Sequence, residues 1–177
     1  MKVTAFAASS SKQSINKKLV NYTANLINGA EIDLLDLNDY ELPLFSQDKE
    51  QELGQPDLAK TFLAKIAQCD ALIISFAEHN GCYTAAYKNI FDWCSRINNK
   101  VFQQKPMLLL STSPGGRGGQ SVLSLAENSA PFFAGNVKAS MAIPSFHENF
   151  DTDKNCLTNE DIQQKLLDAI QLLISDV

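Results

Sequence analysis

The stretch FAASSSKQSIN at residues 6–16 places four serines and an asparagine between an apolar run and a helix-like pattern. Hydroxyl and amide groups donate hydrogen bonds to phosphate oxygens. A helix that begins near Ser14 adds unpaired N–H groups and the positive end of its dipole. The pattern therefore favours a phosphate-binding loop. The stretch by itself leaves a second interpretation open, in which Ser14 only caps the helix and the other serines fill a turn.

The stretch AEHNGCYTAAYKN at residues 77–89 combines a carboxylate, an imidazole, an amide and a glycine after an apolar run. Its Asn80-Gly81 step suits a turn with outward-facing amides, and Gly81 lets a flat ligand approach the main chain. An ordinary strand-to-helix turn is an open alternative. For His79 we favour a hydrogen-bonding or ring-packing role over that of a general acid, because lone histidines more often have such roles.

The stretch SPGGRGG at residues 113–119 holds four of the chain's eight glycines. Backbone amides exposed in this way can form an anion-binding nest or lie along a planar heterocycle. Arg117 is then free to reach a second, negatively charged ligand. A glycine-rich stretch alone is a weak indication of a site, but three unusual stretches in one chain are a stronger one.

The hydrophobic periodicity predicts strands and helices in alternation that would position these three stretches. The expected strands span residues 2–8, 31–37, 70–76, 105–112 and 136–146. The apolar faces of the expected helices are Ile15, Leu19, Tyr22 and Leu26; then Leu58, Phe62 and Ile66; then Ala86, Ile90, Cys94 and Ile97; then Val122, Leu125, Ala126 and Ser129; and last Ile162, Leu166, Ile170 and Leu173, with Thr158 as N-cap. A polar loop is expected between the second strand and the second helix.

This alternation indicates a single α/β domain over residues 1–177, with an open, doubly wound parallel sheet and helices on both faces, in three layers. In such folds ligands bind at the carboxyl ends of the strands, where the strand order reverses. The three unusual stretches follow the first, third and fourth strands. We therefore expect them to meet in one crevice.

Composition narrows the possible partners. The net charge is −5 and the pI about 5.0, which argues against nucleic acid as a partner. A membrane span is not expected, since no apolar run approaches the required length of about 20 residues, and the first residues lack a signal-type apolar region. On these two grounds we expect a cytoplasmic protein. The four cysteines and two histidines show neither a disulfide framework nor zinc-ligand spacing, so we expect no metal.

The three stretches resemble the NAD(P)H-dependent FMN reductases of flavodoxin-like fold, a family that includes quinone, azo-dye and chromate reductases. Its typical motifs are G-S-x-R-x-x-S-x-N, then P-E-Y-N-G followed by K-N-x-x-D-W, and a glycine-rich S-P-G-G. Here the first motif reads ASSSKQSIN at residues 8–16, with Ser11 in place of the arginine. The second reads AEHNG at 77–81, with KNIFDW at 88–93. The third, SPGG at 113–116, matches closely.

The resemblance implies a five-stranded parallel sheet of order 2-1-3-4-5 with FMN as cofactor and NAD(P)H as co-substrate. The FMN-binding residues that it implies are Ser9, Ser11, Ser14, Ile15 and Asn16 for the phosphate and ribityl end, Glu78, His79, Asn80 and Gly81 beside the ribityl and isoalloxazine, and Ser113, Gly115 and Gly116 along the far edge of the ring. Arg117 would bind the substrate. With no arginine in the first loop, charge neutralisation of the phosphate falls to the helix terminus and Lys12.

The implied reaction is hydride transfer from NAD(P)H to bound FMN, followed by reduction of a quinone, flavin or similar small acceptor by a ping-pong mechanism. Because the flavin carries this chemistry, no catalytic acid, base or nucleophile of the protein is required. The family forms homodimers or homotetramers, which makes Tyr87 and Trp93 candidate interface residues; a core role for both is an equal alternative.

Three other functions are alternatives for a chain with these motifs. A flavodoxin-like electron carrier would bind FMN without reacting with pyridine nucleotides. A serine hydrolase is disfavoured because the chain has no G-x-S-x-G motif. The first stretch matches neither the P-loop of ATPases nor the G-x-G-x-x-G pattern of dinucleotide-binding proteins, which argues against both classes. A regulatory protein that has lost the flavin would keep the fold without the cofactor.

Overall fold

The computed structural model describes residues 1–175 and 177. Its centre is a parallel sheet in the order β2-β1-β3-β4-β5. The strands are β1 Lys2–Ala8, β2 Glu31–Leu35, β3 Ala71–Phe76, β4 Pro106–Thr112 and β5 Asn136–Ile143. Val3 of β1 lies opposite Ile32 on one side and Ala71 on the other, so the strand order reverses at β1. The predicted order is confirmed.

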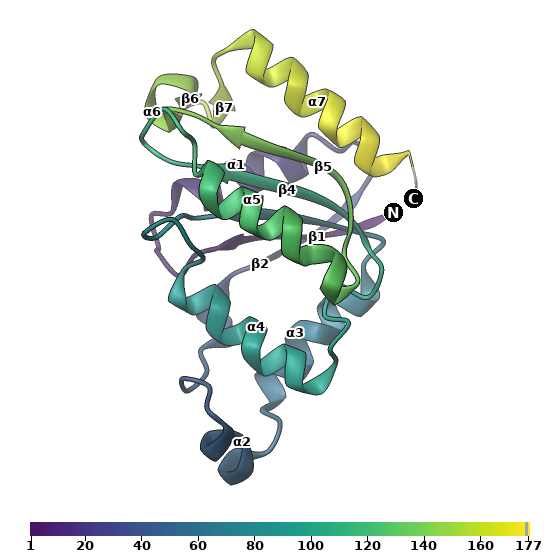
Figure 1. Cartoon of the computed structure of the whole chain (residues 1–177). Helices are drawn as coiled ribbons and strands as arrows, with labels where there is room; N and C mark the ends of the chain where they lie inside the picture. Colours follow the sequence, from purple (N-terminus) through teal and green to yellow (C-terminus); the bar gives the residue numbers. More distant parts are fainter. Residues whose placement is uncertain (176) are drawn as a thin grey trace.

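Helices cover both faces of the sheet and complete the three expected layers (Figure 1). The helices on one face are α1 (Ile15–Asn25) and α7 (Glu160–Ile174), and those on the other are α3 (Asp57–Gln68), α4 (Ala85–Ile97) and α5 (Gln120–Ser129). Successive side chains of β1 pack alternately into the two helical layers, because side chains of a strand alternate between the faces of the sheet. Ala5 packs in the α1/α7 layer, whereas Phe6 packs against α3 and α4.

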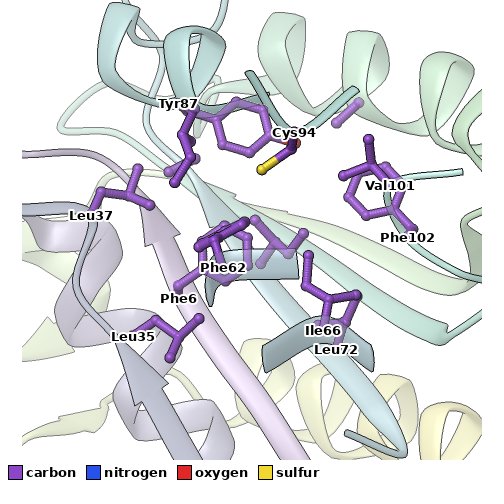
Figure 2. Packing of buried hydrophobic residues seen from close by; sticks show 14 of the residues in the cluster. Phe6, Leu35, Leu37, Phe62, Ile66, Leu72, Tyr87, Cys94, Val101 and Phe102 are labelled. Atoms are coloured by element: carbon purple, nitrogen blue, oxygen red, sulfur yellow. The ribbon is translucent and has the colours of Figure 1, made fainter. Parts of the chain in front are cut away.

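Aromatic side chains fill the layer between the sheet and α3, α4 and α5 (Figure 2). The rings of Phe6 and Phe62 meet edge to face with centroids 5.2 Å apart. Tyr87 is 3% exposed and Trp93 is 1% exposed, and the indole Nε1 of Trp93 donates a hydrogen bond to the Pro43 carbonyl at 2.8 Å. Both residues therefore belong to the core of the chain, and their proposed place at an interface is wrong.

The segment after β2 differs most from the expected polar loop. The carboxylate of Asp36 caps a 3-10 helix, η1 (Leu37–Tyr40), which shortens the expected strand. A further helix, α2 (Gln47–Leu53), follows Ser46 as N-cap and projects from the end of the molecule farthest from α7 (Figure 1). None of the described residues of α2 is buried. Its polar helix-forming sequence has no apolar stripe, so periodicity could not predict it.

Smaller corrections concern the last third of the chain. On α5, Leu123 is buried and Leu125 is 38% exposed, the reverse of the expected facing. The strand β5 ends at Ile143 and is followed by α6 (Phe146–Asn149), β6 (Phe150–Asp151) and β7 (Cys156–Leu157). The cap of α7 is Asn159, whose side chain accepts from the Ile162 N–H, and not Thr158. In the described part of the chain, no helix has both the length and the apolar character needed to cross a membrane.

Candidate functional site

The loops that follow β1, β3 and β4 meet in one open crevice of about 290 Å³ at the carboxyl edge of the sheet. Its lining residues are Ser9, Ser11, Gln13, Ser14, Ile15, Asn16, Ala77, Glu78, His79, Thr112, Ser113 and Pro114. The crevice therefore lies where the strand order reverses, the usual ligand position in open α/β sheets. Gln13, Ala77, Thr112 and Pro114 were not among the site residues predicted from the sequence. Ala77 and Pro114 have no polar side chain, and the motifs specify neither Gln13 nor Thr112.

The first loop combines the two roles that the sequence left open. Ser14 is the N-cap of α1, and its Oγ accepts a hydrogen bond from the Lys17 N–H at 3.3 Å. The Oγ of Ser9 accepts from the Ser11 N–H at 3.2 Å. A hydroxyl oxygen that accepts in this way keeps its own proton as a donor. Ser14 can therefore cap the helix and still donate to a ligand at the positive end of α1.

Asn16 is buried against the ends of two strands. Its Nδ2 donates to the Thr112 carbonyl at 3.1 Å, and its Oδ1 accepts from the Thr112 N–H at 3.0 Å and from the Ser75 hydroxyl at 2.8 Å. Most of the amide's capacity is thus used within the protein. Neither Ser75 nor Thr112 carried a sequence signal, since single hydroxyl residues inside apolar strands are common.

The second loop is a two-residue hairpin. His79 and Cys82 exchange backbone hydrogen bonds, each 3.0 Å long. Asn80 has φ 53° and Gly81 has φ 76°, and positive φ at both central positions is typical of a type I′ turn. This turn places Asn80 and Gly81 at an exposed tip, outside the crevice lining, while His79 lies on the lining itself.

Glu78 links the second loop to the helix that follows the third. Its Oε2 accepts a hydrogen bond from the backbone N–H of Val122 at 2.9 Å. Val122 lies in the first turn of α5, where N–H groups have no partner within the helix. The half-buried carboxylate therefore both lines the crevice and stabilises the start of α5.

The glycines of the third loop divide into two pairs. A Cβ at Gly118 would lie 2.7 Å from the Ile143 carbonyl carbon and oxygen, so the packing of this loop against β5 excludes a side chain. Gly119 has φ 78° and would place a Cβ 3.2 Å from the Ser111 Cβ. At Gly115 and Gly116 a Cβ would meet no described atom within 4 Å. This second pair leaves bare backbone and open space beside the crevice.

The third loop is held from behind by the segment after β5. The Gly115 carbonyl accepts from the Ser145 N–H at 3.0 Å and from the Ser113 hydroxyl at 3.2 Å. Arg117 lies back along α5, where its Nη2 donates to the Ser121 hydroxyl at 3.0 Å. The exposed guanidinium thus stands outside the crevice lining, at the outer side of the loop.

A lysine near the first loop is already engaged by a carboxylate. Lys17 of α1 forms an ion pair with Asp36 at the end of β2. Burial raises the pKa of Asp36, but the hydrogen bonds from Lys17 and Asn38 outweigh it and hold the pKa below the ordinary value of 3.8. Because the charge of Lys17 is neutralised by Asp36, the charge of an anion bound at the loop would be neutralised by the helix terminus and the exposed Lys12.

These features fit FMN. Three hydroxyls at the amino end of α1 suit a phosphate, and the glycine backbone of the third loop leaves room for the edge of a flat ring. Among the described residues, no group of three His, Cys, Asp or Glu side chains is arranged to hold a metal ion. The donors and the open backbone of the site are thus compatible with an anion and a planar group.

Comparison with known proteins agrees with this geometry. Residues 1–148 match the family model described as NADPH-dependent FMN reductase. The chain is 30% identical to an NADPH:quinone oxidoreductase of Arabidopsis thaliana over 72% of this chain and 65% of that protein. It is 27% identical to an NAD(P)H-dependent FMN reductase of Pseudomonas aeruginosa over 98% of this chain and 95% of that protein.

Among solved structures, the flavoenzyme NAD(P)H:acceptor oxidoreductase FerB from Paracoccus denitrificans has the same fold. The TM-score is 0.76 and the identity 24%, over 97% of this chain and 94% of that one. The chain therefore belongs to the NADPH-dependent FMN reductase family, which confirms the resemblance, the enzyme class and the pairing of FMN with NAD(P)H that its motifs predicted.

Proposed function

We propose that this chain binds FMN in the crevice between its three loops and reduces a quinone, a flavin or a similar small acceptor at the expense of NAD(P)H, by a ping-pong mechanism. One observation carries this proposal: phosphate-type donors at the amino end of α1 line the same crevice as Ser113 and Pro114 of the third loop, and the bare backbone of Gly115 and Gly116 follows directly after them. The quinone oxidoreductase name of the plant relative supports the acceptor class.

The proposed FMN site is that of the sequence motifs. The phosphate and ribityl end is assigned to Ser9, Ser11, Ser14, Ile15 and Asn16, the ribityl and ring to Glu78, His79, Asn80 and Gly81, and the far edge of the ring to Ser113, Gly115 and Gly116. Bound FMN would supply the redox chemistry by accepting hydride from NAD(P)H and passing electrons to the acceptor. The chain's own residues bind and orient, and Arg117 is assigned to the nucleotide substrate.

Contacts within the three loops support this assignment of residues to the parts of FMN. Ser14 offers a hydroxyl proton at the positive end of α1, and Glu78 holds the second loop against α5. The open backbone at Gly115 allows a flat ring to approach. Substrate and acceptor would use the same open side of the ring in turn, which is why we propose ping-pong kinetics.

We further propose that residues 1–177 form one FMN-binding domain, that the chain assembles as a homodimer or homotetramer, and that it works in the cytoplasm. Exposed apolar side chains support assembly: Phe132 is 82% exposed and Leu44 is 79% exposed. Four free thiols support a reducing compartment. The acidic net charge supports small-molecule acceptors over nucleic acid.

The test is an absorbance spectrum of the protein reconstituted with FMN, recorded before and after anaerobic addition of NADPH or NADH. Bleaching of the bound flavin, followed by recovery of colour when a quinone is added, is the expected result. FMN that binds but is not bleached would replace the reductase with a flavodoxin-like electron carrier. A protein that stays colourless at saturating FMN would overturn the proposal.

A further inference from the structure

The side chain of Asn16 is held from two neighbouring strands at once. It is 2% exposed and lies in the first turn of α1. Its amide spans Thr112 at the end of β4, as both donor and acceptor, and it accepts a third hydrogen bond from Ser75 in β3. This arrangement joins the start of α1 to the carboxyl ends of the two strands that flank the crevice.

The orientation of the amide follows from its partners. The Thr112 N–H can only donate and the Thr112 carbonyl can only accept, so Oδ1 must face the first and Nδ2 the second. The reversed amide would set donor against donor and acceptor against acceptor. The Ser75 hydroxyl donates to the same Oδ1 at 2.8 Å and so favours this orientation further.

Ser75 contributes from a position outside the crevice lining. It is fully buried in β3, one residue before the end of the strand. On the other side of the network, the Thr112 hydroxyl donates to the Ile143 carbonyl at 2.8 Å. Hydrogen bonds therefore connect Asn16 of α1 to β3 through Ser75, and to β4 and the end of β5 through Thr112. A buried network with all partners satisfied is rigid.

We infer that Ser75 is a positioning residue for the flavin phosphate, acting through Asn16. With the Ser75 hydroxyl in place, Asn16 fixes the amino end of α1 against β3 and β4. Ser14 and the first N–H groups of α1 are then aligned before a ligand arrives, which lowers the cost of ordering them on binding. This inference rests on the proposed FMN site and adds to it a residue that has no contact with the crevice.

The test compares FMN with riboflavin, which lacks the phosphate, as ligands of the apoprotein of Ser75→Ala. We expect the Kd for FMN to rise about two- to tenfold, the range for one net hydrogen bond, and the Kd for riboflavin to stay within about twofold. The ratio of the two affinities is therefore the readout, and a general loss of stability does not change it.

The matched control is Thr4→Val. Thr4 is also a fully buried hydroxyl of the sheet, and its Oγ1 donates to the Lys65 carbonyl in α3 at 3.4 Å, away from the crevice. This variant should leave the FMN-to-riboflavin ratio at the wild-type value. If Ser75→Ala does not fold, Ser75→Cys keeps the shape of the side chain with a weaker donor, and the same fall of the ratio is expected.

Two failures are distinguishable. Wild-type protein that binds no FMN would overturn the proposed function, and this inference with it. Wild-type protein that binds FMN, with a Ser75 variant whose FMN and riboflavin affinities change equally or not at all, would overturn only the positioning role.

Discussion

The carboxylate of Glu78 accepts a hydrogen bond from the backbone N–H of Val122, with 2.9 Å between Oε2 and the nitrogen. This contact replaces a cap that α5 lacks in its own sequence. The N-cap of α5 is Gly119, which is in the left-handed region and brings no side chain to the helix start. Glu78, which lies 44 positions before Val122, therefore stabilises the first turn of α5 and connects the second loop to the helix after the third.

Replacing Glu78 by alanine should lower the free energy of unfolding by about 1–2 kcal/mol, because the Val122 N–H loses a charged partner. Glu78→Gln keeps an acceptor oxygen but loses the charge, so its loss should be about half as large. Urea unfolding of the apoprotein measures both. Equal stabilities for wild type and Glu78→Ala would show that the contact does not stabilise α5.

Replacement by alanine should destabilise the protein at Gly118 but not at Gly115, although the two glycines lie three residues apart in one loop. Gly118→Ala sets a Cβ 2.7 Å from the Ile143 carbonyl group at a φ of +60°, and we expect it to cost about 2–3 kcal/mol of stability. Gly115→Ala adds a methyl group in open space and should change stability by less than about 0.5 kcal/mol. Thermal and urea unfolding of the pair check this; similar losses in both would contradict the assigned packing.

The Lys17–Asp36 ion pair should make stability depend on pH in the acid range. Because the pKa of Asp36 is lower in the folded chain, the pair stabilises the protein above the unfolded value of 3.8, and this contribution is lost as pH falls through the folded value. Asp36→Asn should therefore cost about 0.5–1 kcal/mol at pH 7. The difference from wild type should shrink below pH about 4.

Urea unfolding of wild type and Asp36→Asn at several pH values measures this difference. Lys17→Met removes the other partner and should show the same acid convergence. A gap between wild type and Asp36→Asn that persists undiminished below pH about 3 would mean that the asparagine acts through packing and not through charge.

Arg117 should matter for the nucleotide and not for the flavin. Its guanidinium is exposed and contacts Ser121 outside the crevice lining, and it is assigned to the nucleotide substrate. Arg117→Ala should therefore raise the KM for NADPH about three- to tenfold and leave the Kd for FMN within about twofold. The matched control is Arg96→Ala, which breaks the ion pair with Glu50 of α2. Steady-state kinetics and FMN titration separate the two effects, and a larger change in FMN affinity than in KM would refute the assignment.

The sequence was most informative where side chains repeat with the period of their element. The run from Ala71 to Phe76 and the stripe of Phe62 and Ile66 are apolar because packing requires it, so their elements could be predicted. The helix α2 escaped prediction because its stability comes from the Ser46 cap and good helix formers, without a buried face. The facing of Leu123 and Leu125 was reversed because both are leucines and, two positions apart in one helical turn, they point to nearly opposite faces, so residue type does not decide which of them is buried.

By itself the sequence determined the chemistry of the three loops, their order along the chain and the family, because residue types and spacings are local properties. Only the tertiary structure decided which residues of different elements contact one another at the site. Ser75 and Asn16 are 59 positions apart, and their contact depends on the pairing of β1 with β3. The same holds for Glu78 with Val122, and for the clash that reserves position 118 for glycine. Such contacts arise between elements brought together by the fold, and no local pattern encodes them.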